Sequence, residues 1–143
     1  MRVMPDLGGP SPNLAWSELA CRDAGRTCYP IEWRSTRAVE LAKAFERIRE
    51  ICGFPLLVNS GYRTFDYNVS IGGAAKSQHV EGRALDLVPS VPGKKALQKL
   101  REAAGQARSE GLIRGIGIYD GFVHVDTRPG KNASWSGPRT PIA

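Results

Sequence analysis

Two histidines and two aspartates are the residues of this chain whose types and spacing suggest chemistry. His79 and Asp86 lie in the stretch SQHVEGRALD, and His124 and Asp126 lie in the stretch FVHVD. The chain contains no other histidine. Two imidazoles and one carboxylate, with a fourth position left for water, form a common ligand set of catalytic zinc, whereas structural zinc is closed by four ligands rich in cysteine. The sequence therefore predicts a metal site made by His79, Asp86 and His124.

The spacing in the last third of the chain indicates how a sheet would present two of these side chains. An Asp-Gly dipeptide at 120–121 joins two alternating apolar runs, which predicts a two-residue hairpin with a type I′ turn. In that register Gly117 faces His124, and Gly115 faces Asp126. Because opposed side chains point to the same face of a sheet, His124 and Asp126 should project over a face that two glycines leave open.

The residues around Asp86 have the same two-sided pattern. In the predicted strand 83–88, Asp86 points to one face and the two leucines point to the other. His79 lies just before this strand, in a loop that Gly82 allows to turn back towards Asp86. We therefore expect this strand and the hairpin to bring His79, Asp86 and His124 together.

Helices and strands are segregated along the chain rather than alternating, which favours an α+β fold. Apolar residues spaced by three and four predict two long helices, the first with Ser35 or Thr36 as its N-cap. In chain order the expected elements are an irregular lead-in at 1–16, a short helix at 18–21 capped by Ser17, a helix from 36 to 53, a strand at 55–63, a loop at 64–78, a strand at 83–88, a helix from 94 to 111, the hairpin and an irregular tail at 130–143. We expect a single domain over 1–143, with a small, mainly antiparallel sheet and flanking helices.

Length and composition fit one soluble domain, with 143 residues of which 41% are hydrophobic and 24% are charged. The formal net charge is +6, but the basic residues are scattered and form no run or aromatic-interleaved stripe. We therefore expect no nucleic-acid partner and a monomer, although an anionic polymer such as a bacterial wall would attract this surface. A basic nucleic-acid binder stays as a third hypothesis, to be tested by the salt dependence of DNA affinity.

The cysteines and the N-terminus add limited information. Cys21, Cys28 and Cys52 contain no C-x-x-C pair, so they are poor zinc ligands. Cys52 falls on the apolar face of the first long helix, and a disulfide between Cys21 and Cys28 is left open. The N-terminus lacks a signal sequence, and no segment approaches the roughly 20 apolar residues of a membrane span. We expect a product made in the cytoplasm without a signal peptide and no membrane partner.

Three stretches closely resemble the zinc D-Ala-D-Ala carboxypeptidase family, also called the VanY-type metallopeptidases. These stretches are SGYRT (60–64), NVSIGGAAKSQHVEGRALDL (68–87) and GIGIYDGFVHVDTRP (115–129). The S-x-H-x-x-G-x-A-x-D pattern followed by F-V-H-V-D is specific to this family, which shares a superfamily with lysostaphin-type peptidases and the hedgehog amino-terminal domain. The resemblance implies the fold of that superfamily.

The same resemblance implies a function. His79, Asp86 and His124 would bind one zinc ion, and the substrate would be the peptide stem of peptidoglycan. Carboxypeptidases and cell-wall endopeptidases, including phage lysins, both occur in the family. The short chain without a signal favours a phage lysin or virion-associated enzyme that acts on the cell wall.

The resemblance is incomplete at the general base. Many relatives carry Glu or Asp three residues before the last zinc histidine, and that position is Gly121 here. We expect Asp126 to be the base, because it lies on the same strand face as His124; its alternative role is to orient the His124 imidazole. Asp120 is the other nearby acid, but the hairpin turn should direct it away from the strand face.

Arg63, in S-G-Y-R, matches a family arginine that steadies the carbonyl or carboxylate of the substrate. The planar guanidinium of Arg63, with its several N–H donors, suits a developing oxyanion. The alternative role of Arg63 is a salt bridge that holds the loop. The expected reaction is hydrolysis, with Asp126 transferring the proton and Arg63 stabilising the tetrahedral oxyanion. Because Gly121 replaces the acid, a zinc-containing wall-binding or structural module without catalysis is the second hypothesis.

Overall fold

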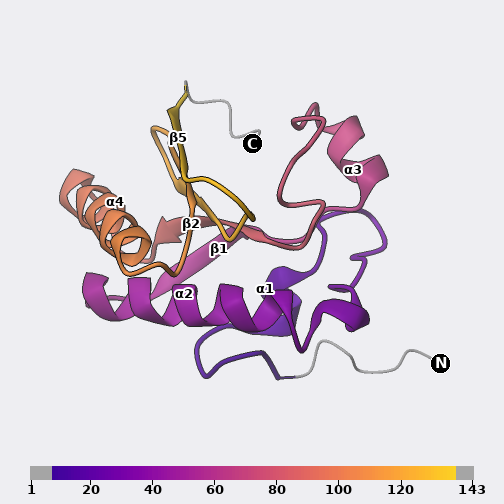
Figure 1. Cartoon of the computed structure of the whole chain (residues 1–143), viewed down its shortest axis with the longest axis horizontal. Coiled ribbons are helices and arrows are strands. Elements are labelled where there is room, and N and C mark those ends of the chain that lie inside the picture. The colour runs from indigo at the N-terminus through magenta and orange to yellow at the C-terminus, as the bar shows by residue number, and fades with distance from the viewer. Residues whose placement is uncertain (1–7, 138–143) are drawn as a thin grey trace.

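The computed structural model describes residues 8–137 and contains one five-stranded sheet (Figure 1). Its strands are β1 (Leu56–Ser60), β2 (Ala84–Pro89), β3 (Gly115–Ile118), β4 (Val123–Asp126) and β5 (Ala133–Ser136). They lie in the order β1-β2-β4-β3-β5, and every pair is antiparallel except β3 with β5. The expectation of a small, mainly antiparallel sheet is confirmed.

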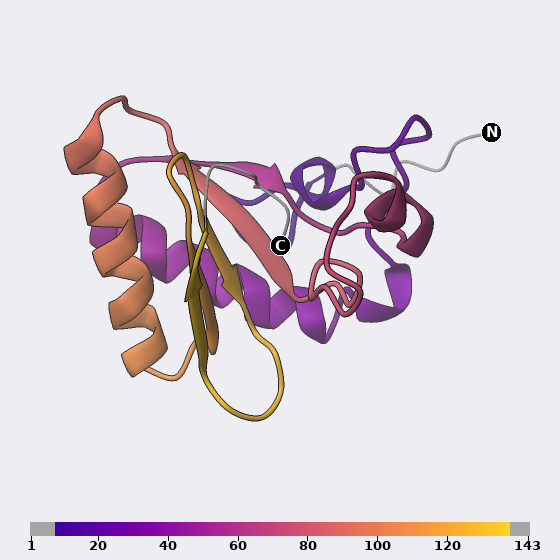
Figure 2. The same cartoon turned by 90° about the horizontal axis from the view of Figure 1, so that it is seen from above.

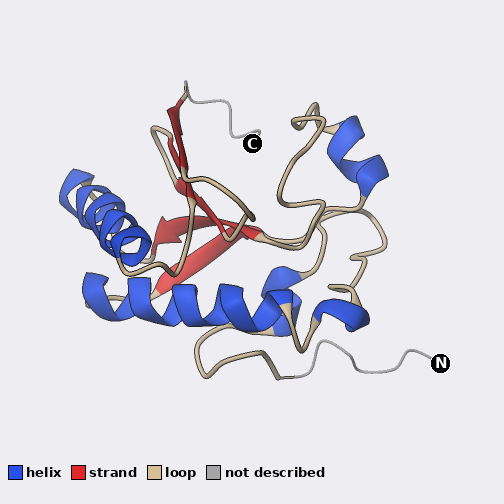
Figure 3. Ribbon diagram, viewed as in Figure 1, coloured by secondary structure: helices blue, strands red, loops and turns tan. Residues whose placement is uncertain are grey.

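Two long helices pack against one face of this sheet (Figure 3). They are α1 (Trp16–Leu19), the 3₁₀ helix η1 (Ile31–Trp33), α2 (Arg37–Cys52), α3 (Phe65–Ser70) and α4 (Lys94–Ser109). The two long helices, α2 and α4, contact each other, and α4 also contacts β2, β3 and β4 (Figure 2). None of the described helices is long and apolar enough to cross a membrane. The α+β class is therefore confirmed.

The core lies between these helices and the sheet. Leu85 and Leu87 of β2 are fully buried against it, as are Phe45 and Ile48 of α2. Burial of such a side chain contributes roughly 1.5–3 kcal/mol. Since Leu85 and Leu87 occupy the core face of β2, Asp86 between them must point to the opposite face.

The predicted helices are present with small shifts at their ends. α2 ends at Gly53, whose left-handed backbone (φ 77°) lets its N–H donate to the Arg49 carbonyl. α1 begins two residues earlier than predicted, because the Glu18 carboxylate accepts from the Ala15 N–H (2.9 Å) and Ser17 is not the cap. All three cysteines are free, so the disulfide is not formed, and Cys52 packs in the core as predicted.

The prediction of a loop at 64–78 is wrong for its first half, which forms α3. The Thr64 hydroxyl accepts a hydrogen bond from the Tyr67 N–H (3.1 Å) and caps the helix. Asn68 is buried inside this helix, and its amide donates to the Ala74 carbonyl (2.9 Å). The helix is too short for a hydrophobic period to reveal it, and its signal was the capping threonine.

The prediction of an irregular tail from residue 130 is also wrong, because residues 133–136 form β5. This strand pairs in parallel with β3, so that Gly117 lies beside Trp135. Ala133 and Trp135 are half-buried and the two serines between and after them are exposed. Two apolar residues are too few for an alternating pattern to stand out.

The predicted lead-in is irregular over residues 8–15 apart from a bridge between Ser11 and Leu14, and residues 1–7 and 138–143 lie outside the described part.

The hairpin has the predicted register but not the predicted turn. Gly117 pairs with His124, and Gly115 pairs with Asp126. Neither residue of the 120–121 turn has the positive φ that a type I′ turn needs. The Tyr119 carbonyl, which would close such a turn, instead accepts from Arg101 Nη2 (3.1 Å). The strand pairing, and not the turn type, therefore sets the register.

Candidate metal centre

Three side chains converge on the face of the sheet opposite α2. His79 Nε2 lies 3.1 Å from Asp86 Oδ1, and His124 Nδ1 lies 3.0 Å from the same oxygen. One ligand atom from each residue falls within 4.8 Å of the others, and all three side chains are buried. The structure thus brings together the three residues that the sequence predicted as metal ligands.

Strand pairing and one glycine account for this convergence. β2 and β4 are neighbours, and their register places Asp86 directly opposite His124. His79 precedes β2 in a turn at Gly82, whose φ is +67°. The Tyr29 hydroxyl donates to the Gly82 carbonyl (2.6 Å) and holds this turn against the core. A left-handed residue at position 82 therefore directs the loop, and His79 with it, back towards Asp86.

Each imidazole is oriented by a hydrogen bond from its other nitrogen. His79 Nδ1 lies 2.7 Å from the Gly61 carbonyl, which can only accept, so Nδ1 carries the proton and Nε2 has a free lone pair. His124 Nε2 lies 2.7 Å from Asp126 Oδ2, which leaves Nδ1 as the ligand atom. Two such nitrogens and a carboxylate oxygen fit a zinc ion. Metal-bound histidines usually have a hydrogen-bond partner on their other ring nitrogen, and both histidines have one here.

Asp126 lies on the far side of His124 from Asp86 and is fully buried. Its carboxylate also accepts from Arg128 Nε (2.8 Å), Arg128 Nη2 (2.7 Å) and the Arg128 N–H (3.1 Å). A Cβ atom at Gly115 would lie 2.2 Å from Asp126 Oδ2, so the glycine provides the space for this carboxylate. Burial works to raise the pKa of Asp126, but Arg128 and His124 outweigh it and hold the pKa well below its usual range.

Arg63 reaches the centre from the loop after β1. The register of β1 against β2 shifts between Val58 and Ser60, and this bulge places Ser60 opposite Asp86. Arg63 is buried and its Nη2 lies 3.6 Å from Asp86 Oδ2, the oxygen that faces away from the imidazoles. Its other nitrogens donate to Ser60 Oγ (3.2 Å) and Asn68 Oδ1 (3.2 Å). Burial lowers the pKa of Arg63, and the nearby Asp86 opposes that shift.

The charges around Asp86 favour its ionised form. Burial works to raise the pKa of Asp86, but the two imidazoles outweigh it and hold the pKa well below its usual range. Burial also lowers the pKa of His79, which keeps that ring neutral at neutral pH. Metal ligands must be an ionised carboxylate and neutral imidazoles, so burial and contacts already favour the required state of these two residues.

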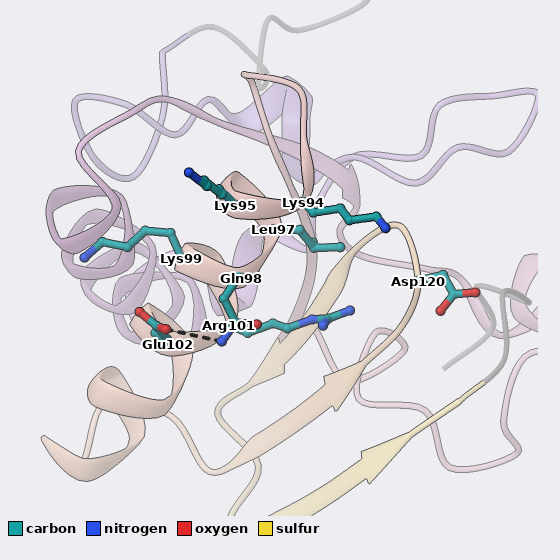
Figure 4. Close-up of a pocket in the computed structure, with 8 residues that line it drawn as sticks. All are labelled: Lys94, Lys95, Leu97, Gln98, Lys99, Arg101, Glu102 and Asp120. Carbon is teal, nitrogen blue, oxygen red and sulfur yellow. Dashed lines mark hydrogen bonds between the residues drawn. The ribbon is translucent and has the colours of Figure 1, made fainter.

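Asp120 and Gly121 lie away from the centre. Asp120 is exposed on the turn between β3 and β4, where it borders a hollow of about 680 Å³ together with Lys94, Lys95 and Arg101 of α4 (Figure 4). Gly121 is exposed and has no atom within 4 Å of the place where a Cβ would be. The expectation that the turn directs Asp120 away from the strand face agrees with this arrangement.

Trp135 is a residue of the site that the sequence did not reveal. Its ring centroid lies 5.0 Å from that of His124, and its Nε1 donates to the Tyr119 hydroxyl (2.7 Å). The space above Gly117, predicted to be open, is filled by this indole. Only the pairing of β5 with β3 brings Trp135 here, and the sole hint in the sequence was the alternation of A-S-W-S.

Comparison with known protein families matches residues 12–126 to Peptidase M15. The match covers most of the chain, so the protein belongs to the peptidase M15 family, which is the family that its motifs resemble. Its fold and its site are those of a metallopeptidase, with a His-Asp-His group able to hold one metal ion.

A curated relative has a more specific name. The chain is 35% identical over 86 residues to the zinc D-Ala-D-Ala carboxypeptidase of Streptomyces albus G, an alignment that covers 59% of this chain and 31% of the relative. The aligned part therefore spans about a third of the relative's length. The predicted resemblance to zinc carboxypeptidases is confirmed, and the relative supports zinc as the metal.

Proposed function

We propose that this protein is a zinc-dependent peptidase that hydrolyses peptide bonds in the stem or cross-link of peptidoglycan. The observation that carries the proposal is the convergence of His79, Asp86 and His124. Both imidazole rings are already oriented, each by a hydrogen bond from the nitrogen that faces away from Asp86. Family membership supports the class of reaction, and the named relative supports the substrate.

Zinc is the metal that this donor set suits. Two neutral imidazole nitrogens and one carboxylate oxygen leave a position for water or substrate. Zinc bound there would polarise the scissile carbonyl and lower the pKa of a water molecule towards neutrality. Asp86 and His124, paired across β2 and β4, and buried His79 from the turn before β2 would hold the ion.

We assign Asp126 a positioning role. Its Oδ2 accepts from His124 Nε2, and Arg128 occupies both carboxylate oxygens. These contacts support the second of the two predicted roles, in which Asp126 keeps His124 in the tautomer that frees Nδ1. The role of Asp126 as general base stays a prediction.

Arg63 holds the opposite side of the centre. Its ion pair with Asp86 Oδ2 leaves Oδ1 directed at the two imidazoles. The guanidinium also places a buried positive charge beside the ligands, where it would favour charge developing on the substrate carbonyl. Stabilisation of the oxyanion by Arg63 is the role we propose beyond this contact.

A second candidate is a zinc-containing wall-binding module without catalysis. It is favoured by one observation, that position 121 is an exposed glycine while the Asp126 carboxylate is bonded to His124 and Arg128. The two candidates share the metal and differ in turnover.

The decisive experiment is digestion of defined muropeptides, read by mass spectrometry, together with metal analysis of the same sample. We expect one zinc per chain, loss of a D-amino acid or of a cross-link, arrest by a chelator and recovery with added zinc. His124→Ala should lose both zinc and cleavage. Cleavage retained by metal-free His124→Ala would contradict the proposal, and bound zinc without cleavage of any muropeptide would favour the non-catalytic module.

A further inference from the structure

The hollow of about 680 Å³ that Asp120 borders lies between the first turns of α4 and the turn that joins β3 to β4 (Figure 4). Its volume falls in the range of ligand pockets, and the three proposed metal ligands are not among the residues that line it. We call it the basic hollow, because its lining has two acids, Glu102 and Asp120, and four cations: Lys94, Lys95, Lys99 and Arg101.

The cations of the basic hollow keep their charge uncompensated. In the part of the chain that the structure describes, none of the four forms an ion pair with a carboxylate. Glu102 instead accepts a hydrogen bond from Gln98 Nε2 (3.2 Å), and the Asp120 carboxylate points away from α4 (Figure 4). Arg101 Nη2 donates to the Tyr119 carbonyl (3.1 Å), which is a neutral partner. Four cations against two acids therefore leave a net positive charge.

The three lysines of the basic hollow stand where they destabilise α4. Lys94 and Lys95 occupy the first turn of the helix, where the positive end of the helix dipole favours acids, and that turn contains no acid. Lys95 and Lys99 form a like-charge pair one turn apart, which is also unfavourable. All three lysines are exposed. A bound anion would relieve both repulsions, so the hollow is complementary to negative charge.

We propose that the basic hollow binds the phosphodiester groups of an anionic cell-wall polymer. Lys94 and Arg101 are seven residues apart, about 10 Å along the helix axis, so a ligand that reaches both must carry repeated charges. A chain with one phosphate in each repeat satisfies this condition, because Lys and Arg both donate to phosphate oxygens. The described lining of the hollow contains no aromatic side chain, so the base stacking that single-stranded nucleic acids use is missing.

Tyr119 connects the basic hollow to the metal centre. Its carbonyl accepts from Arg101, and its hydroxyl accepts from Trp135 Nε1 (2.7 Å), whose ring packs against His124. A polymer bound in the hollow would therefore hold the wall beside the metal centre without occupying it. The site goes beyond the proposed function, because it uses none of the metal ligands. Only the choice of a wall polymer as the occupant rests on that function.

The first test measures binding of lipid-free poly(glycerol phosphate) to the full-length, zinc-loaded protein by calorimetry at low and high salt. We expect Lys94→Gln/Lys95→Gln to bind about tenfold more weakly at low salt, and its slope of log K against log salt to be shallower by about one to two, because two phosphate contacts are lost. Lys43→Gln/Lys131→Gln removes the same charge from exposed lysines outside the hollow and should bind like the wild type.

The second test measures sedimentation of the protein with purified walls. Hydrofluoric acid removes phosphodiester-linked polymers from walls and leaves the carboxylates of the stem peptides in place. We expect the wild type to sediment with intact walls and to be retained about tenfold less on stripped walls, because the phosphate contacts are gone. Lys94→Gln/Lys95→Gln should digest soluble muropeptides at the wild-type rate.

Absence of binding to poly(glycerol phosphate), or equal weakening in the two double variants, would overturn the inference, because the second result would show attraction by net charge alone. Equal retention on intact and stripped walls would overturn it as well. Tighter binding of single-stranded DNA of the same charge would assign the hollow to nucleic acid instead. Failure of the proposed function looks different: the polymer would bind as expected while no muropeptide is cleaved.

Discussion

At the scale of single residues, the site depends on which nitrogen of each histidine is free. His79 and His124 use different ring nitrogens towards Asp86, and in each case a backbone or side-chain oxygen holds the other nitrogen. Residues outside the proposed ligand set therefore decide the geometry of the proposed ligands. Asp126 is the clearest example, because it lies behind His124 and is itself held by Arg128.

Replacing Asp126 separates its two predicted roles. Asp126→Asn should weaken zinc binding by about 10- to 100-fold, because the amide no longer fixes the His124 tautomer. Competition against a chromogenic chelator measures this affinity, and Asp120→Asn, an exposed acid on the turn, is the matched control with no expected change. Normal zinc affinity with abolished turnover would instead identify Asp126 as the base.

The cysteines should differ in reactivity according to their surroundings. Burial raises the pKa of Cys52 to about 11, so roughly one thiol in a thousand is ionised at about pH 8. Iodoacetamide at that pH should label half-buried Cys28 first and leave Cys52 unmodified in the folded protein, with Cys52 labelling rising as the pH approaches 11. Peptide mass spectrometry reads both sites. Labelling of Cys52 as fast as Cys28 would show that α2 opens locally.

At the scale of elements, the sheet register does most of the positioning. The pairs Asp86 with His124 and Gly115 with Asp126 follow from β2, β4 and β3 lying side by side, and β5 then adds Trp135 to the same face. Glycine is needed on β3 because the carboxylate of Asp126 and the indole of Trp135 occupy the space of its missing side chains. The short strands are thus adapted to the site as much as to the core.

Two glycine-to-alanine substitutions should have opposite effects. Gly115→Ala places a methyl group against the pinned Asp126 carboxylate, so we expect a loss of about 1–3 kcal/mol in the free energy of unfolding and weaker zinc binding. Gly105→Ala, at an exposed position of α4 with no atom near the new methyl, should stabilise by about 0.5–1 kcal/mol and leave zinc binding unchanged. Urea unfolding and zinc titration measure both. Unaltered stability in Gly115→Ala would mean that Asp126 can move freely.

At the scale of the whole molecule, the metal centre links parts that are distant in sequence. The loop before β2, strand β2 and strand β4 would each contribute one ligand, on the sheet face away from the helical core. Metal binding requires these segments to be folded against each other, so zinc should bind the native state and not the unfolded chain.

Zinc should therefore raise the thermal stability of the wild type. At a free concentration about 100 times the Kd, the expected gain is about 2.7 kcal/mol in the free energy of unfolding. Thermal unfolding with zinc and with EDTA measures the difference as a shift in Tm. His79→Ala should show the same Tm in both conditions, and a wild-type Tm unaffected by EDTA would contradict binding at this centre.

The sequence by itself determined the three residues that converge as candidate metal ligands, the hairpin register and the long helices, because these depend on local patterns. Alternation predicts which strand face His124 occupies, and a period near 3.6 predicts α2 whatever packs against it. The two-sided pattern of strand 83–88 and the turn allowed by Gly82 predicted Asp86 and His79 as partners of His124, and the family motif implied the same three residues. Each of these inferences needs only residues close in sequence or a specific spacing.

Only the tertiary structure decided the surroundings of Asp126 and Trp135. Both strand alternation and sequence spacing place Asp126 near His124, but which side of the imidazole it occupies depends on Arg128 and Gly115 around it. Trp135 reaches His124 through a parallel pairing of β5 with β3, and such a contact leaves little mark on a four-residue strand. The metal could be predicted from the chain alone, whereas the surroundings of His124 arise from packing between segments far apart in sequence.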